Sequence, residues 1–128
     1  MTSPVFELLL FHVDSVPLTI RLAEAGVDGV IVDWESSGKQ ARQAGWDTQI
    51  ALPDPEALSQ LKLACACPLL CRIDHQPQTL HRQVEAALTG GGEEILLPMI
   101  RAPAEVEFFL GLVNGRCRAS ILVETQAA

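Results

Sequence analysis

Charged side chains stand where the apolar runs of this sequence end. Asp33 and Glu35 follow the run 30–32, Arg72 and Asp74 follow or interrupt the run 69–73, and Glu124 follows the run 120–123. Carboxylates can bind cations or transfer protons, and a guanidinium can hold an acidic ligand. Any one of these charges could simply cap a strand end in solvent. Charged residues recur at the ends of successive apolar runs, since His12 and Asp14 stand at the end of the first run and Arg101 after the fourth. This repetition favours a ligand site.

Asp33 and Glu35 form the most specific pattern. They are two positions apart at the end of an extended run, so both side chains are expected on one face, with Trp34 on the other. Two carboxylates can therefore converge at this point of the fold.

Five strands are expected to position these residues. They are indicated by short apolar runs at residues 6–12, 27–34, 69–73, 95–100 and 120–123. The unalternated run Val30 to Val32 is typical of a central parallel strand covered on both faces, and Pro98 is tolerable where the fourth strand leaves the sheet.

Stretches of helical periodicity separate these runs. Ser15 is expected to cap a helix that runs through Ala25 and stops at Gly26, and further helices begin at proline residues 55, 77 and 103. The positions expected to be buried on the last three helices are Leu58, Leu61 and Cys65, then Leu80, Val84, Ala87 and Leu88, then Val106, Phe109, Leu110 and Val113. Strand–helix alternation predicts an α/β fold with parallel pairing and right-handed crossovers, whose ligand site lies beyond the carboxyl ends of the strands.

Composition limits the classes of function. The 128 residues suffice for a single domain, residues 1–128, and the net charge of −7 without a Lys/Arg-rich block argues against nucleic acid as a partner. The amino-terminal apolar stretch is interrupted by Glu7 and is shorter than a membrane span, so we expect a cytoplasmic protein without a membrane partner.

The four cysteines are expected to be reduced residues that fill the core. The spacing of Cys65, Cys67 and Cys71 lacks the paired motifs that structural zinc sites prefer, and Cys117 stands far from them in sequence.

Four segments resemble, in order, the strand motifs of the citrate lyase β-subunit and HpcH/HpaI-type aldolase family. They are DGVIVDWES at residues 28–36, LLCRID at 69–74, EEILLPMIRAPAEVEFFL at 93–110 and ILVETQAA at 121–128. The resemblance covers nearly the whole chain. It implies a parallel (β/α) barrel of the TIM type, of which this chain supplies the N-terminal portion, about five of the eight β-α units.

The resemblance also implies an activity and residue roles. Members are carbon–carbon lyases that use Mg²⁺ or Mn²⁺ to cleave or form a bond next to the carbonyl of a keto acid or acyl-CoA substrate. Glu124 then corresponds to a metal ligand, and Arg72 to the catalytic and substrate-binding arginine that stabilises an enolate oxygen. Asp33 corresponds to a substrate-binding residue, and Glu35 to a catalytic residue that assists proton transfer.

Two departures from the family pattern matter. Ser36 stands where the aldolases carry a histidine after the second-strand glutamate. A closed barrel needs about 250 residues, so the remaining units and the second metal carboxylate would come from further residues, a second chain or a symmetric partner. Unpaired strand edges would favour a homo-oligomer.

Three alternatives stay open. The chain could be a non-catalytic half-barrel that binds a small acidic ligand or a partner subunit. His12 could be a base or a structural residue. A short helix is expected near residues 39–44. Its Lys39, Arg42 and Gln43 could attract an anionic substrate or simply be solvated.

Overall fold

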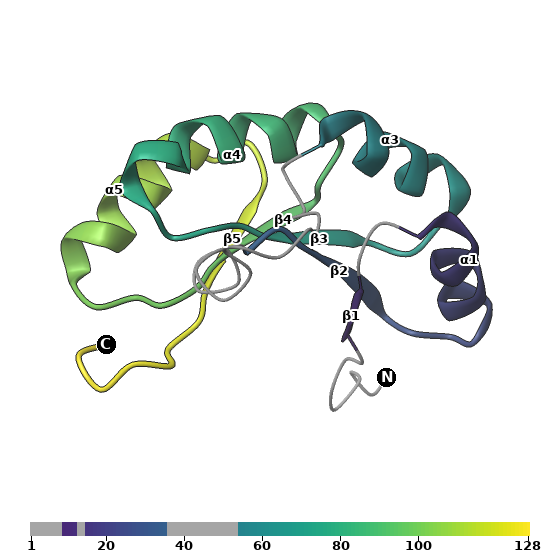
Figure 1. Ribbon diagram of the computed structural model, residues 1–128, viewed down its shortest axis with the longest axis horizontal. Helices are drawn as coiled ribbons and strands as arrows, with labels where there is room; N and C mark the ends of the chain where they lie inside the picture. The colour runs from purple at the N-terminus through teal and green to yellow at the C-terminus, as the bar shows by residue number, and fades with distance from the viewer. Residues whose placement is uncertain (1–8, 13–14, 36–53) are drawn as a thin grey trace, which may run out of the picture.

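Five short strands lie side by side in one parallel sheet (Figure 1). The computed structural model describes residues 9–12, of which only the backbone is described, together with 15–35 and 54–128. The strands are β1 (Leu9–His12), β2 (Gly29–Asp33), β3 (Leu69–Arg72), β4 (Glu94–Leu97) and β5 (Arg118–Ile121), and they pair in the order of the chain.

A single row of helices accompanies the sheet. The helices α1 (Val16–Glu24), α3 (Pro55–Ala64), α4 (Pro77–Thr89) and α5 (Pro103–Val113) alternate with the strands, and each packs on the next. In Figure 1 they follow one side of the curved sheet. A sequential strand order with helices on one side differs from the doubly wound fold, in which the strand order reverses and helices cover both faces. The predicted parallel α/β architecture is confirmed for the described residues.

Capping side chains and prolines fix where the helices begin. The Ser15 hydroxyl accepts from Leu18 N at 3.2 Å, and the Asp54 carboxylate accepts from Glu56 N and Ala57 N at 3.1 and 3.2 Å. Each of the four helices has a proline in its first turn, where the missing N–H costs nothing. The predicted helix starts are confirmed.

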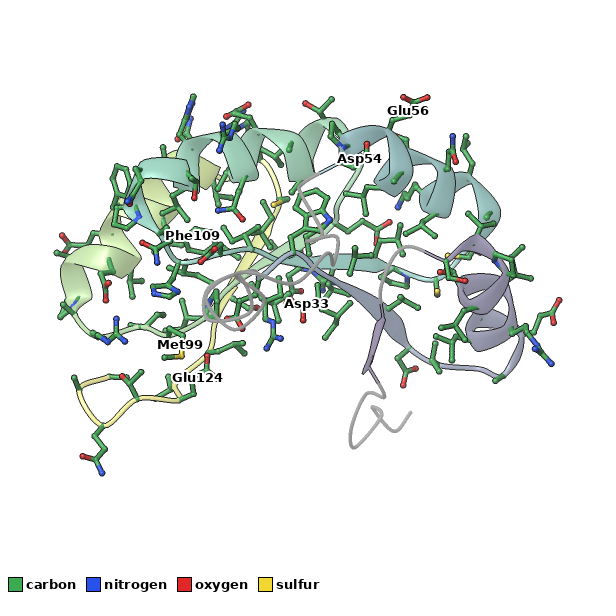
Figure 2. The ribbon with its side chains drawn as sticks, in the orientation of Figure 1. Asp33, Asp54, Glu56, Met99, Phe109 and Glu124 are labelled. Atoms are coloured by element: carbon green, nitrogen blue, oxygen red, sulfur yellow. The ribbon has the colours of Figure 1, made fainter. Side chains whose placement is uncertain are left out.

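The hydrophobic core lies between the sheet and this helix row. Val30 and Val32 of β2, Cys71 of β3 and Ile95 of β4 face it, and Phe109 of α5 is fully buried there (Figure 2). Gly90 permits close packing of α4 on α3, because a Cβ at this position would lie 2.8 Å from Leu58 Cβ and from the Pro55 carbonyl oxygen.

The opposite face of the sheet carries a second, smaller cluster. Ile31, Leu70 and Leu96 come from three adjacent strands, are at most 6% exposed, and contact Leu122. Because side chains alternate along a strand, Asp33 and Arg72 lie on this face two residues beyond Ile31 and Leu70, and Glu124 follows Leu122 by two residues in the segment after β5. This face therefore leads from an apolar layer to the predicted site.

Four sequence predictions differ from the structure. The fourth strand ends at Leu97 and not at residue 100, because Pro98 has no N–H and Met99 adopts a left-handed φ of 56°. The fifth strand is Arg118–Ile121, two residues earlier than expected. Leu110 is 49% exposed, because the buried face of α5 centres on Phe109 and Val113. Cys65, expected in a buried stripe, is the partly buried C-cap of α3.

Several predictions lie outside the described residues. These are the strand portion 6–8, the side chain of His12, and residues Asp14, Ser36, Lys39, Arg42 and Gln43 with the short helix expected near 39–44. Within the described ranges, no helix combines the length and apolar character needed to cross a membrane.

Candidate functional site

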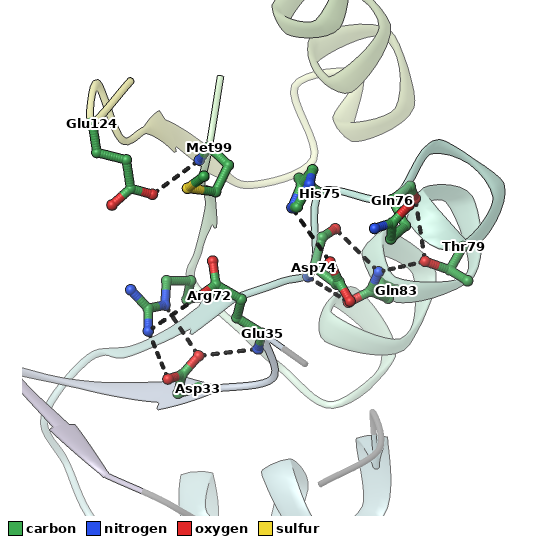
Figure 3. Close-up of polar contacts among 10 residues, drawn as sticks. All are labelled: Asp33, Glu35, Arg72, Asp74, His75, Gln76, Thr79, Gln83, Met99 and Glu124. Atoms are coloured by element: carbon green, nitrogen blue, oxygen red, sulfur yellow. Dashed lines mark hydrogen bonds and ion pairs between the residues drawn. The ribbon is translucent and has the colours of Figure 1, made fainter. Parts of the chain in front are cut away.

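Asp33 and Arg72 form a bidentate ion pair at the carboxyl end of the sheet (Figure 3). They are register partners on the neighbouring strands β2 and β3, so their side chains emerge side by side on the same face. Arg72 Nε donates to Asp33 Oδ1 at 3.0 Å, and Nη2 donates to Oδ2 at 2.7 Å. The Arg72 side chain is 20% exposed and the Asp33 side chain 15%, so the ion pair is held in a partly desolvated environment.

Glu35 converges on the same guanidinium. Its Oε1 lies 3.7 Å from Arg72 Nη2, and its backbone N–H donates to Asp33 Oδ1 at 3.0 Å. Trp34 between them points the other way and is 2% exposed in the core. The prediction that Asp33 and Glu35 share one face is confirmed.

The surroundings of Glu35 raise the pKa of its carboxyl group. Burial raises the pKa of the Glu35 carboxyl most, Arg72 lowers it, and the negative charges of Asp33, Glu124 and Asp74 raise it further. Glu35 Oε2 is buried without a hydrogen-bond partner. The pKa of Arg72 is raised, first by its hydrogen bond to Asp33, so the arginine keeps its charge. The site thus pairs a fixed cation with an acid that holds its proton more tightly than usual.

Glu124 reaches the same rim from the segment after β5. Its Oε1 accepts from Met99 N at 2.9 Å, and its charge acts on both Glu35 and Arg72 (Figure 3). The left-handed backbone of Met99 turns this N–H toward the carboxylate after β4 ends. The sequence predicted the glutamate but not its partner, because nothing in the local sequence marks Met99 for this conformation.

Asp74 belongs to a different arrangement. Its backbone N–H donates to Gln83 Oε1 at 2.7 Å, and its carbonyl oxygen accepts from Gln83 Nε2 at 3.2 Å. Gln83 is 2% exposed and also donates to Thr79 Oγ1 at 2.9 Å. This network joins the loop after β3 to α4. Sequence reasoning missed Gln83, although a glutamine on the apolar face of α4 was a visible signal.

An apolar cavity adjoins this rim between the loops after β3 and β4. Leu80, Met99, Ile100 and Phe108 line it, and His75 is one of its few polar residues. His75 Nδ1 is buried and lies 3.5 Å from Asp74 Oδ1, too far for a hydrogen bond of useful strength. Arg101, also predicted at the rim, is exposed, and its backbone N–H donates to Glu105 at the start of α5.

Carboxylate oxygens at this rim suit a hard divalent cation. Within the described ranges, no group of three His, Cys, Asp or Glu side chains is arranged to hold a metal ion. Mg²⁺ commonly uses only one or two protein carboxylates and completes its shell with water and substrate oxygens. Glu124 is exposed at the rim and is a donor of the right kind. Asp33 is less suited, because both of its oxygens accept from Arg72.

The structure brings Asp33, Glu35 and Arg72 into contact and places Glu124 within electrostatic reach of them. Comparison with known proteins adds no family to this geometry, since neither a protein-family model nor a curated protein sequence matches the chain.

Proposed function

We propose that this protein is a divalent-metal-dependent carbon–carbon lyase of the aldolase type, acting next to the carbonyl of a keto acid or acyl-CoA substrate. One observation carries the proposal. Arg72 of β3 contacts the carboxylates of Asp33 and Glu35 at the carboxyl end of a parallel sheet, and the Glu124 carboxylate after β5 lies within electrostatic reach of them. The resemblance of four ordered segments to citrate lyase β-subunits and HpcH/HpaI-type aldolases supports the same reading.

Arg72 is the substrate-binding and charge-stabilising residue of this proposal. Cleavage beside a carbonyl leaves negative charge on an enolate oxygen, and a fixed guanidinium stabilises that charge more in the transition state than in the substrate. Asp33 holds Arg72 through two hydrogen bonds, which fixes the orientation of the guanidinium before substrate binds. In this arrangement Asp33 positions Arg72.

Glu35 is the proton-transfer residue. Cleavage requires removal of a proton from the substrate hydroxyl and return of a proton to the enolate carbon. A carboxylate whose pKa is raised is a stronger base than an ordinary glutamate, so Glu35 suits the acceptance of the hydroxyl proton. Its position beside Arg72 places the proton next to the charge that the arginine stabilises.

Glu124 would hold Mg²⁺ or Mn²⁺. When bound, the ion supplies a Lewis acid that polarises the substrate carbonyl. Glu124 Oε1 already accepts from Met99 N, so this backbone contact sets the direction of the carboxylate.

The finer architecture is part of the proposal. Sequential strands with helices on one side have the topology of a (β/α) barrel, so we propose that the sheet closes with further β-α units.

The second candidate function is a half-barrel that binds a partner subunit. It is favoured by the exposed apolar side chains of Ile121, at the end of β5, and Val123, just after it, which are 40% and 70% exposed. A molar-mass measurement in solution tests this candidate, because a strictly monomeric chain would contradict it.

The lyase proposal is tested by metal-dependent cleavage of a panel of hydroxy-keto acids and acyl-CoA thioesters. We expect product release with Mg²⁺ or Mn²⁺ and loss of activity with a chelator. Arg72→Lys should lower kcat/KM at least tenfold with the fold retained, since lysine lacks the planar fork. Arg101→Lys, at an exposed arginine of the same rim, is the matched control and should keep the wild-type rate.

Glu124→Gln should weaken metal binding, because a neutral amide is a poorer ligand for a hard cation. Glu107→Gln, at an exposed position of α5, is its control. The proposal is wrong if no substrate of either class is cleaved, or if Arg72→Lys and Glu124→Gln behave like their controls.

A further inference from the structure

Two cysteines face each other in the turn between α3 and β3. Cys65 is the C-cap of α3 with extended backbone, and the chain bends at Ala66 and Cys67 before β3 begins at Leu69. This bend brings Cys65 Sγ to 3.4 Å from Cys67 Sγ. Both are free thiols and both are partly buried. The turn lies at the amino end of β3, whereas Arg72 lies at its carboxyl end.

We propose that Cys65 and Cys67 form a reversible dithiol–disulfide site that is oxidised by small disulfides such as oxidised glutathione. The proposal is independent of the lyase activity. It rests on the contact between the two sulfur atoms, which need to approach by little more than an ångström to reach bonding distance.

The reaction is a pair of thiol–disulfide exchanges. The Cys65 thiolate attacks one sulfur of oxidised glutathione, which forms a mixed disulfide and releases one glutathione thiolate. The Cys67 thiolate then attacks Cys65 Sγ, which forms the intramolecular disulfide and releases the second glutathione. The protein dithiol loses two electrons, oxidised glutathione gains them, and the two thiol protons pass to the released glutathione molecules.

The pH dependence of the reaction follows from the surroundings of Cys67. Burial, and after it the hydrogen bond with Cys65, raises the pKa of Cys67 to about 11. Cys67 therefore keeps its proton at neutral pH, so the reaction should be faster in mild alkali.

The other two cysteines differ in their surroundings. Cys71 is fully buried within β3, and burial raises the pKa of Cys117 just before β5. Cys117 Sγ donates to the Arg118 carbonyl oxygen at 3.2 Å. Oxidation should therefore be selective for the turn.

The disulfide should be easily reduced. It would close a ring containing only one intervening residue, so it gains little from loop closure and strains the turn. Strained disulfides have more oxidising potentials and exchange readily. The carbonyl oxygen of Pro68 accepts from Val30 N at 3.0 Å, so this turn is attached to the start of the β2–β3 ladder.

The test is a thiol count on the folded chain after equilibration with oxidised glutathione at pH 8. We expect the four free thiols of the sequence to fall to two, and dithiothreitol to restore all four. After alkylation and tryptic digestion, the fragment of residues 63–72 should carry one alkyl group and be lighter by two hydrogens, and tandem mass spectrometry should place the alkyl group on Cys71 and the bond between Cys65 and Cys67. This measurement assigns the bond in the wild-type chain without a variant.

Cys65→Ser and Cys67→Ser should each lose the intramolecular bond and carry a glutathione adduct on the remaining thiol. Cys117→Ser is the matched control and should still lose two thiols. The proposal is overturned if folded wild type keeps four thiols, if oxidation requires a denaturant, or if the bond joins Cys71 or Cys117 to another cysteine.

Discussion

The ion pair of Asp33 and Arg72 should be coupled more strongly than an exposed pair of the same geometry. The perturbation is a double-mutant cycle with Asp33→Asn, Arg72→Met and the double variant. Asparagine keeps an oxygen that can accept from Glu35 N, and methionine keeps much of the apolar stem of arginine. The cycle therefore isolates the charged contact from the local turn and from packing.

The magnitude follows from geometry and burial. Two charge-assisted hydrogen bonds of 3.0 and 2.7 Å join the side chains, which are 20% and 15% exposed. Fully exposed pairs contribute about 0–1 kcal/mol, and breaking a fully buried pair costs about 3–5 kcal/mol. Arg72 also has Glu35 at 3.7 Å, which partly compensates for the loss of Asp33. We expect a coupling free energy of about 1–3 kcal/mol.

Urea unfolding followed by tryptophan fluorescence measures this coupling, since Trp34 is buried beside Asp33. The matched control is the cycle on Arg116 and Glu85. This pair is also bidentate, at 3.2 and 2.5 Å, but its side chains are 44% and 40% exposed. Solvent screens such a pair, so its coupling should be weaker.

Equal coupling in the two cycles would refute the reasoning. It would mean that partial burial does not strengthen the Asp33–Arg72 contact, and that Asp33 does not hold Arg72 in a fixed orientation. The proposed role of Asp33 as a positioning residue would then lose its physical basis.

Four other substitutions have predictable outcomes in the same unfolding assay. Because folding raises the pKa of Glu35 above its ordinary 4.5, the stability from its protonated form is fully present below pH 4.5 and is lost as pH rises through the folded pKa. Glu35→Gln cannot titrate, so it should gain stability relative to wild type as pH rises from 4 to 8, and a pH-independent difference would contradict this. Gln83→Leu should cost about 1–3 kcal/mol, because it leaves the buried N–H and carbonyl of Asp74 without their partner; an unchanged midpoint would show that the network is dispensable. Gly90→Ala should destabilise by about 1–3 kcal/mol through its clash with α3, whereas Gly111→Ala, with open space around it in α5, should stabilise by about 0.5–1 kcal/mol. The same sign for both glycines would contradict the packing argument.

Local sequence determined the elements of this fold. Ser15, Asp54 and the first-turn prolines specify helix starts through their own hydrogen bonds and fixed φ, without help from distant residues. The period of two at the end of β2 likewise places Asp33 and Glu35 on one face and Trp34 on the other. These predictions succeeded because their causes act over a few residues.

Contacts between elements decided the rest. The register that sets Asp33 beside Arg72 joins residues 39 positions apart, and the Met99–Glu124 hydrogen bond joins residues 25 apart. The left-handed backbone at Met99 ends β4 early, and Leu110 is exposed because the orientation of α5 on the sheet selects Phe109 and Val113 for the core. Sequence alone therefore identified the charged residues at the strand ends, but only the paired strands determined which of them are in contact. The distance between side chains across a sheet depends on strand register and twist, which no single segment encodes.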